Sequence, residues 1–370
     1  MEIFKPYGFD KAATGIAVIL LVVGFVMVAS SSAVLANEKY HQSLYFLVQQ
    51  LVGAAAGVAL VIALLSVRKP FYQNPYIVYG LLVLSLFLLA ICFVMPTVAR
   101  VNRWVILFGL RFQPSELAKI SLVLFLAYYL EQKRDRLHEW RVLLLPVSVI
   151  GFSTLLILKE PDFGTAILMF GICALLLFLG GVKLRHLALL GAAAAAVFVI
   201  YLFSARYRVE RIAGFMSPEK DPLGKNFQPY QSKLAVGSGG LLGVSLGMST
   251  QKLYFLPCAH TDFIYAIVGE EFGLLGTLAI LLLFFALLWR GLVISARAPT
   301  AAAQLAAIGL TLAICVQALF NITVVLGLGP AKGVPLPLVS FGRSSLICNL
   351  AAVGILLNIS QRRGIERKRT

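Results

Sequence analysis

The segment HTDFIYAIVGEEFGLLGTLAILLLFFALLW, residues 260–289, joins a long apolar run to three carboxylates. Between Asp262 and Arg290 the only charged residues are Glu270 and Glu271. The run is longer than the ~20 residues that a helix needs to cross a bilayer. It therefore predicts a membrane-spanning helix, and its acids need an explanation because charge within a membrane span is costly.

The composition of the whole chain agrees with this segment. The 370 residues are 60% hydrophobic and 13% charged, with a mean hydropathy of +0.90. Soluble domains are roughly half apolar and a quarter charged, so we predict an all-α polytopic membrane protein with residues 1–370 in one membrane domain. Ten apolar runs are predicted to span the membrane: 12–36, 44–66, 72–95, 114–130, 142–158, 163–182, 187–205, 263–289, 300–326 and 338–360.

Basic residues predict how the chain is oriented. They gather in 66–71, 131–141, 181–186 and the tail 361–370, and loops rich in Lys and Arg stay in the cytoplasm. Both termini are then cytoplasmic, and 206–262 is one large extracytoplasmic loop between the seventh and eighth helices. The net charge of +16 reports this topology, and we expect no nucleic-acid partner.

Two further groups of polar residues lie at the predicted outer side. Glu116 and Lys119 are three residues apart and share a helix face, so they form either an internal ion pair or the lining of a cavity. Ser115 or Glu116 is also placed to cap the helix that begins near Pro114. Asp162, in the turn KEPDFGT (159–165), is interpreted equally well as a helix cap or as a functional acid.

The large loop carries glycines and cations. Its run GSGGLLG (237–243) is not followed by G-K-[ST] and lacks a βαβ context, so we do not predict a nucleotide site. The glycines are better suited to tight turns or to close approach of a ligand. Arg206, Arg208, Arg211 and Lys233 predict binding of an anionic group such as phosphate, with anchoring to lipid headgroups as the alternative for each one.

The acids of the opening segment have competing interpretations. Asp262 is placed to cap the helix that follows it, whereas Glu270 and Glu271 need buried partners, for which Lys119, Lys332 and Arg343 are the candidates. Glu271 is predicted to face inward. Scattered histidines and the absence of known nucleophile motifs leave two options: transport along a gradient, or reaction with an already activated substrate.

Several ordered motifs together resemble the SEDS family (shape, elongation, division and sporulation) of FtsW and RodA proteins. The motifs are RW…FQPSELAK (103–119), EPDFGT (160–165), FMSPEKDPLG through QSKLAVGSGGLLG (215–243), HTDF with GEEFGLLG (260–276) and GLGPAKGVPLPLVSFGRSS (327–345). The last motif is more similar to the cell-division branch, FtsW, than to the elongation branch, RodA. Lys332 and the paired Ser344–Ser345 carry that distinction.

This resemblance implies a peptidoglycan glycosyltransferase that polymerises lipid II at the outer face of the bacterial cytoplasmic membrane during division or elongation. Asp262 matches the proposed general base, while Glu116, Lys119 and Asp162 match cavity residues, with Glu271 structural or tuning the cavity. The implied substrate-binding residues are Arg103, Arg206, Arg211, Lys233 and Ser344. The resemblance also implies a divalent cation (Mg²⁺ or Mn²⁺), no nucleotide, a class B penicillin-binding protein transpeptidase as partner, and other divisome or elongasome membrane proteins.

The chain departs from the family pattern at Cys258, Phe341 and Arg343, which replace a glutamate, a tyrosine and a glycine. These departures leave Asp262 in place. A lipid II flippase is the alternative function, because buried acids in transporters relay protons, and a scaffold that only recruits division proteins is a third. The motif charges cluster on the predicted outer side, which favours an enzyme acting in the outer leaflet over a flippase.

Overall fold

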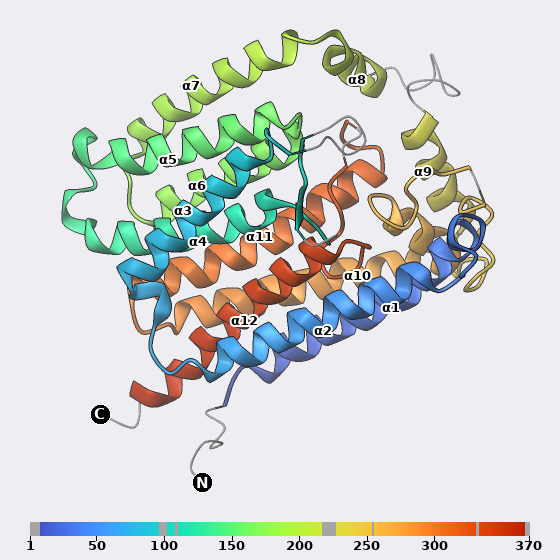
Figure 1. Ribbon diagram of the computed structural model, residues 1–370, viewed down its shortest axis with the longest axis horizontal. Coiled ribbons are helices and arrows are strands. Elements are labelled where there is room, and N and C mark those ends of the chain that lie inside the picture. Colours follow the sequence, from blue (N-terminus) through green and yellow to red (C-terminus); the bar gives the residue numbers. More distant parts are fainter. Residues whose placement is uncertain are drawn as a thin grey trace.

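The computed structural model describes residues 8–95, 102–107, 110–216, 227–253, 255–330 and 333–366. They form a helical bundle in which most helices run roughly along one direction (Figure 1). The elements are α1 (Lys11–Tyr40), α2 (Tyr45–Ser66), η1 (Phe71–Gln73), α3 (Pro75–Ile91), β1 (Val105–Leu107), β2 (Leu110–Phe112), α4 (Pro114–Gln132), η2 (Arg134–Arg136), α5 (Trp140–Lys159), α6 (Phe163–Leu179), α7 (Leu184–Phe203), α8 (Arg206–Met216), α9 (Phe227–Ser238), α10 (Ile264–Ala296), α11 (Ala301–Val325) and α12 (Arg343–Glu366).

Every predicted span overlaps one of these helices, and the chain is an all-α polytopic membrane protein. Within the described residues, 7 helices are long and apolar enough to cross a membrane. They are α1, α2, α5, α7, α10, α11 and the first part of α12, while α3 and α6 are shorter apolar helices. The number of helices that cross the membrane stays a prediction. The predicted loop 206–262 contains α8 and α9.

Burial differs sharply between the helices. In α4 nearly every side chain from Pro114 to Leu130 is buried, against α3, α6 and α11. In α7, His186 is the one buried residue among those described, and this helix lies at the edge of the bundle (Figure 1). A helix that is apolar all round belongs either in a protein interior or in lipid, and α4 and α7 illustrate the two cases.

Small residues let the central helices approach closely. A Cβ atom added at Gly309 of α11 would lie 2.6 Å from Val123 of α4 and 2.9 Å from Leu176 of α6. At Gly57 of α2 it would lie 2.4 Å from Leu350 of α12. Helices in membranes pack through such small residues because lipid supplies no hydrophobic drive for them to associate.

Helix α10 is broken at Gly273, which has φ 63° and ψ −156°. In an unbroken helix the N–H groups of Leu274 and Leu275 would donate to the carbonyls of Glu270 and Glu271. Here they donate to the carbonyls of Gly240 and Leu241, at 2.9 and 3.4 Å. The break would otherwise leave these donors without partners, which is costly at membrane depth.

The carbonyls freed by the break are also satisfied by the glycine loop. Those of Glu270 and Glu271 accept from the N–H groups of Val244 and Ser245, at 3.0 and 3.2 Å. The contact is so close that a Cβ atom at Gly243 would lie 2.2 Å from the Glu271 carbonyl oxygen. The glycines of the run 237–243 thus allow the backbone of this loop to lie in direct contact with the backbone of the broken helix.

The break changes the interpretation of the predicted span 263–289. A straight helix of the 33 residues of α10 would be about 50 Å long, well beyond the ~30 Å of a bilayer core. The part after the break, 274–296, has a length suited to crossing. Glu270 and Glu271 belong to the short part before it, so they are not charges in the middle of a lipid-facing span.

Candidate active site

The first turns of α4 carry a buried ion pair. Lys119 Nζ lies 3.0 Å from Glu116 Oε1, and both side chains are almost completely buried, so the predicted pair is present. Lys119 Nζ also donates to Gln317 Oε1, and Ser345 Oγ donates to Glu116 Oε2 at 3.2 Å. We call these four residues the inner network. Both of its charges have partners, the condition under which buried charge is tolerated.

The predicted cap of α4 is wrong. Its N-cap is Gln113, its first helical residue is Pro114, and no side chain caps it. Ser115 Oγ is buried and has no hydrogen-bond partner in the described part of the chain. Proline has no N–H group, so at the first helical position it needs no hydrogen-bond acceptor. The Glu116 carboxylate accepts hydrogen bonds within the inner network instead.

Helix α11 connects the inner network to the segment before α10. Gln317 Nε2 donates to the Pro335 carbonyl at 3.0 Å. One turn later, Asn321 Nδ2 donates to the carbonyls of Val334 and Asp262, each at 2.7 Å. Two amide side chains on one face of α11 therefore fix the backbone of the loop after α11 and the backbone at Asp262.

The side chain of Asp262 does not cap a helix, contrary to that interpretation of the sequence. The N-cap of α10 is Phe263, and no side chain donates or accepts there. The Asp262 carboxylate lies instead against Gly333, where an added Cβ atom would be 2.8 Å from Oδ2. Because it caps no helix, this carboxylate is available for other contacts.

Asp262 is held in an unusual electrostatic environment. Burial raises its pKa to about 6; the positive charge of Arg103 opposes this shift and the negative charge of Asp162 adds to it. Desolvation disfavours the charged form of a carboxyl group. The result is a carboxylate whose proton affinity near neutral pH suits a general base.

Asp162 caps a helix, as one interpretation of its sequence context predicted, and it also contacts Arg103. Its Oδ1 accepts from the Thr165 N–H at 3.2 Å and so caps α6. Its Oδ2 lies 3.8 Å from Arg103 Nη1 and 3.5 Å from Gln113 Nε2. Arg103 lies two residues before β1, whose Val105 pairs with Phe112 of β2, and β2 leads to the start of α4.

Glu160 is an acid of this region that the sequence did not single out. Its side chain is fully buried, and apart from the nearby Cys92 thiol neither carboxylate oxygen has a hydrogen-bond partner among the described residues. Burial, followed by the charge of Asp162, raises its pKa to about 8, while Arg103 and the nearby Cys92 thiol oppose the shift. We call Glu160, Asp162 and Asp262 the carboxylate cluster, with Arg103 as their shared cation.

The raised pKa of Glu160 predicts a pH dependence of stability. A carboxyl that binds its proton more tightly when folded stabilises the fold below its unfolded pKa, and this contribution is lost as pH rises toward about 8. We expect Glu160→Gln to flatten the decline of the Tm between about pH 5 and 8, relative to wild type. Asp135→Asn, at an exposed acid, is the control. Equal pH slopes for wild type and Glu160→Gln would show that Glu160 does not titrate this way.

Glu271 belongs to a separate cluster. Lys252 Nζ lies 2.7 Å from Glu271 Oε1, and Ser30 Oγ of α1 donates to both carboxylate oxygens, at 2.6 and 2.8 Å. Glu270 accepts instead from the Thr250 N–H and hydroxyl, at 2.9 and 3.0 Å. Both acids are buried and have hydrogen-bond partners, so their role is structural.

Two of the three partners predicted for these acids, Lys119 and Arg343, are therefore wrong. Lys119 pairs with Glu116, and Arg343 Nη1 donates to Gln49 Oε1 of α2 at 2.7 Å. Lys332 lies outside the described residues. The sequence could not reveal Lys252 as the partner, because the break at Gly273 brings the glycine loop and the turn after it over the start of α10.

The predicted substrate-binding cations do not converge on one point. Arg206 is 93% exposed and pairs with Glu210 on α8 at 3.3 Å. Lys233 of α9 lies across the start of the loop after α11, where a Cβ atom at Gly327 would be 1.8 Å from its Cε. The side chain of Arg211 lies outside the described residues. Arg103 is the predicted cation that contacts the carboxylate cluster.

Several residues of the site were missed by sequence reasoning. Ser344 was predicted, and it is buried, but Ser345 is the serine bonded to Glu116. Gln317 and Asn321 lie inside the predicted span 300–326, where polar side chains are costly. That rule, applied to amides as well as to charges, would have found both.

The departures from the family pattern lie around this region. Cys258 is exposed and has φ 61°. The Phe341 ring packs on Phe46 of α2, with centroids 5.0 Å apart. Arg343 is directed to α2 as described, so it does not add a cation to the carboxylate cluster.

Comparison with known proteins shows the family. The family model FTSW_RODA_SPOVE, described as "Cell cycle protein", matches residues 11–364. Stage V sporulation protein E of Bacillus subtilis (strain 168) is 40% identical over 351 residues, covering 94% of this chain and 95% of that protein. A protein of Trichlorobacter lovleyi named probable peptidoglycan glycosyltransferase FtsW is 39% identical over 363 residues, covering 96% and 94%.

Solved structures agree over nearly the whole chain. A structure described as "Structural coordination of polymerization and crosslinking by a peptidoglycan synthase complex" matches with TM-score 0.78 and 28% identity, covering 96% of this chain and 98% of that one. The rod shape determining protein RodA of Thermus thermophilus matches with TM-score 0.70 and 27% identity, with the same coverage. The chain therefore belongs to the FtsW/RodA/SpoVE family of cell cycle proteins.

Proposed function

We propose that this protein is a peptidoglycan glycosyltransferase that polymerises lipid II, with Asp262 as the general base. The observation that carries the proposal is the Asp262 carboxylate, which caps no helix and lies against Gly333 beside Arg103 and Asp162. The proposal is supported by relatives 36–39% identical that are named probable peptidoglycan glycosyltransferases.

The site faces the outside of the bacterial cytoplasmic membrane, and both termini are cytoplasmic. Both termini lie at one end of the bundle, with the α2–α3, α4–α5 and α6–α7 connections (Figure 1). These connections include the basic segments 66–71, 131–141 and 181–186, which belong in the cytoplasm. The start of α4, the α5–α6 turn and the start of α10 lie toward the opposite end.

The reaction joins an acceptor sugar hydroxyl to the anomeric carbon of a lipid-linked donor. Asp262 takes the hydroxyl proton as the new carbon–oxygen bond forms, and the bond to the polyprenyl pyrophosphate breaks with its electron pair on that leaving group. Arg103 is placed to stabilise the negative charge that develops there. Asn321 holds the backbone at Asp262 and so orients the base.

A divalent cation, Mg²⁺ or Mn²⁺, is part of the proposal. Among the described residues no group of three or more His, Cys, Asp and Glu side chains could hold a metal ion. Mg²⁺ is often held by only one or two carboxylates together with substrate phosphates, and Asp162, whose charge acts on Asp262, would serve in that mode while Asp262 stays the base. A bound cation would supply charge stabilisation to the departing pyrophosphate.

The proposal includes a crosslinking partner. One solved structure that this chain resembles is of a complex described as coordinating polymerization and crosslinking. We propose a class B penicillin-binding protein transpeptidase as partner, within the divisome or elongasome. The sequence relatives named here carry FtsW and SpoVE names, which supports a division-type or sporulation-type role over elongation.

The experiment is glycan-strand formation from labelled lipid II by the purified protein with its cognate transpeptidase. We expect polymer in the presence of Mg²⁺ or Mn²⁺ and its loss with EDTA, because the leaving group is a pyrophosphate. Transfer of lipid II across vesicles without polymer would instead support the flippase. Polymer formation that EDTA leaves unchanged would remove the cation from the proposal.

A further inference from the structure

The loop after α9 is apolar and exposed, and the proposed reaction does not use it. Residues 234–251 contain no charged residue, although they lie within the predicted extracytoplasmic loop. We call residues 241–248 the apolar loop. Its large apolar side chains are between 41% and 77% exposed: Leu241, Leu242, Val244, Leu246 and Met248. A contiguous exposed apolar patch marks contact with a membrane, a ligand or another protein.

The apolar loop continues the exposed apolar face of α10. After its break, α10 exposes large apolar side chains at alternating spacings of three and four, which places them on one helix face. They are Leu275, Leu278, Leu282, Phe285 and Trp289. The Leu275 N–H donates to the Leu241 carbonyl at 3.4 Å, so the apolar loop begins where this face ends. The face of α10 and the loop therefore form one continuous apolar surface.

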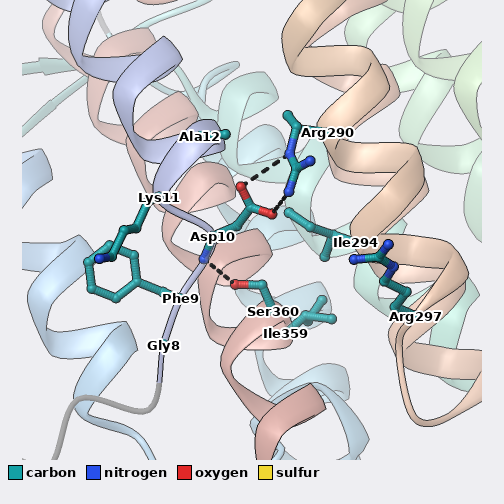
Figure 2. Close-up of a pocket in the computed structure, with 10 residues that line it drawn as sticks. All are labelled: Gly8, Phe9, Asp10, Lys11, Ala12, Arg290, Ile294, Arg297, Ile359 and Ser360. Atoms are coloured by element: carbon teal, nitrogen blue, oxygen red, sulfur yellow. Dashed lines mark hydrogen bonds and ion pairs between the residues drawn. The ribbon is translucent and has the colours of Figure 1, made fainter.

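Contacts at both ends of α1 indicate the depth of this surface in the bilayer. Asp10 pairs with Arg290 at the end that holds both termini (Figure 2), and Ser30 donates to Glu271 toward the other end. Because charge is costly in the bilayer core, Asp10 and Arg290 mark one boundary of that core. From Asp10 to Ser30 a helix rises about 30 Å, and the core is ~30 Å thick. Glu271 therefore lies at the opposite boundary, and any tilt of α1 places it deeper.

The apolar loop lies at the same level as Glu271. The Ser245 N–H donates to the Glu271 carbonyl at 3.2 Å, and α9 with the loop after it lies at the end of the bundle opposite both termini (Figure 1). Backbone at membrane depth must find its hydrogen-bond partners within the protein. The N–H groups of Gly243 and Met248 also have such partners, the carbonyls of Gly239 and Ser245, at 2.8 and 3.2 Å. These bonds lower the cost of placing the loop in the bilayer.

A groove between α1 and the apolar loop is suited to a hydrocarbon chain. It has a volume of about 690 Å³. Among the described residues its polar lining side chains are Ser30 and Lys252, and both are bonded to Glu271. The remaining lining is apolar and includes Val26 of α1 and Leu246 of the loop. The surface left for an occupant is thus apolar, which favours an acyl chain over water.

We propose that the apolar loop enters the hydrocarbon of the bilayer as a re-entrant segment, in the leaflet opposite both termini. Lipid acyl chains cover its exposed side chains and fill the groove beside α1. The assignment to the outer leaflet rests on the proposed topology. The second half of the segment predicted as an extracytoplasmic loop over 206–262 then returns into the membrane before α10 begins.

The test is the accessibility of a spin label in the purified full chain, reconstituted in phosphatidylcholine nanodiscs. A nitroxide is attached to Leu242→Cys or to Met248→Cys in a Cys258→Ser background, because Cys258 is exposed and the other four cysteines are buried. Molecular oxygen is apolar and concentrates in hydrocarbon, whereas a polar nickel chelate stays in water. We expect the ratio of oxygen to chelate accessibility at both positions to approach that of Leu282→Cys, an exposed position on α10.

Asp135→Cys, at an exposed acid outside the predicted spans, is the reference for water, and both loop positions should exceed its ratio several-fold. A ratio like that of Asp135→Cys at either loop position would place the loop in water. Low accessibility to both reagents would show that protein, such as a second copy of this chain, covers it. Either result overturns the proposal, and the Tm of each labelled variant checks that the fold is kept. The readout requires no polymerisation, so its failure leaves the proposed enzyme activity untouched, and the reverse also holds.

Discussion

Asp262→Asn is expected to reduce glycan polymerisation at least ~100-fold, the lower end of what a general base contributes. The amide has nearly the same shape as the carboxylate but cannot accept the proton of the acceptor hydroxyl. The backbone carbonyl at residue 262 still accepts from Asn321, so the fold should be kept. The measurement is the initial rate of polymer formation from labelled lipid II, together with the Tm of each protein.

The pH dependence of the wild-type rate gives an independent check. Burial raises the pKa of Asp262 to about 6, and a general base acts in its ionised form, so the rate should rise with pH through about 6. Asp135→Asn, which makes the same chemical change at an exposed acid, should keep both the rate and this profile. Substantial polymerisation by Asp262→Asn would assign the base to another residue.

Lys119→Ala is expected to destabilise the protein and to abolish polymerisation. It leaves the buried Glu116 carboxylate with only the Ser345 hydroxyl, and breaking a buried pair by removing one partner costs about 3–5 kcal/mol. It also frees Gln317, which holds the Pro335 carbonyl, so the loop beside Asp262 loses part of its support. The measurements are the Tm and the rate with lipid II.

The double variant Glu116→Gln/Lys119→Met separates stability from function. It removes both charges, so most of the stability lost in Lys119→Ala should return. If polymerisation returns as well, the pair is only structural; if the protein is stable but inactive, the pair shapes the site. A Tm for Lys119→Ala equal to that of wild type would contradict the assignment of a buried ion pair.

The helices were predictable from the sequence because hydropathy over ~20 residues is a strong local signal. The contact between Glu116 and Lys119 was also predictable, since helix geometry fixes the neighbours of a residue three positions away. Lys252 as partner of Glu271 was not, because the two residues are 19 positions apart and meet only through the tertiary fold. Such contacts depend on tertiary packing, which leaves no short-range pattern in the sequence.

The functional acids were also predictable only in part. Asp262 stood out because it opens an apolar run, but its freedom from capping follows from backbone geometry at Phe263. Glu160 was visible in the motif EPDFGT, yet its full burial depends on how α3, the α5–α6 turn and Arg103 meet. Residue type suggests candidate chemistry, whereas burial and neighbouring charge decide which candidate has an altered proton affinity.

The break in α10 also bears on how the chain is made. Membrane proteins emerge from the ribosome from the N-terminus onward, so residues 240–245 are synthesised before Glu270 to Leu275. The backbone groups that pair across the break therefore have their partners already outside the ribosome when α10 appears. A truncated chain that starts at Ile264 would carry these four peptide groups into the bilayer without partners, which is costly there.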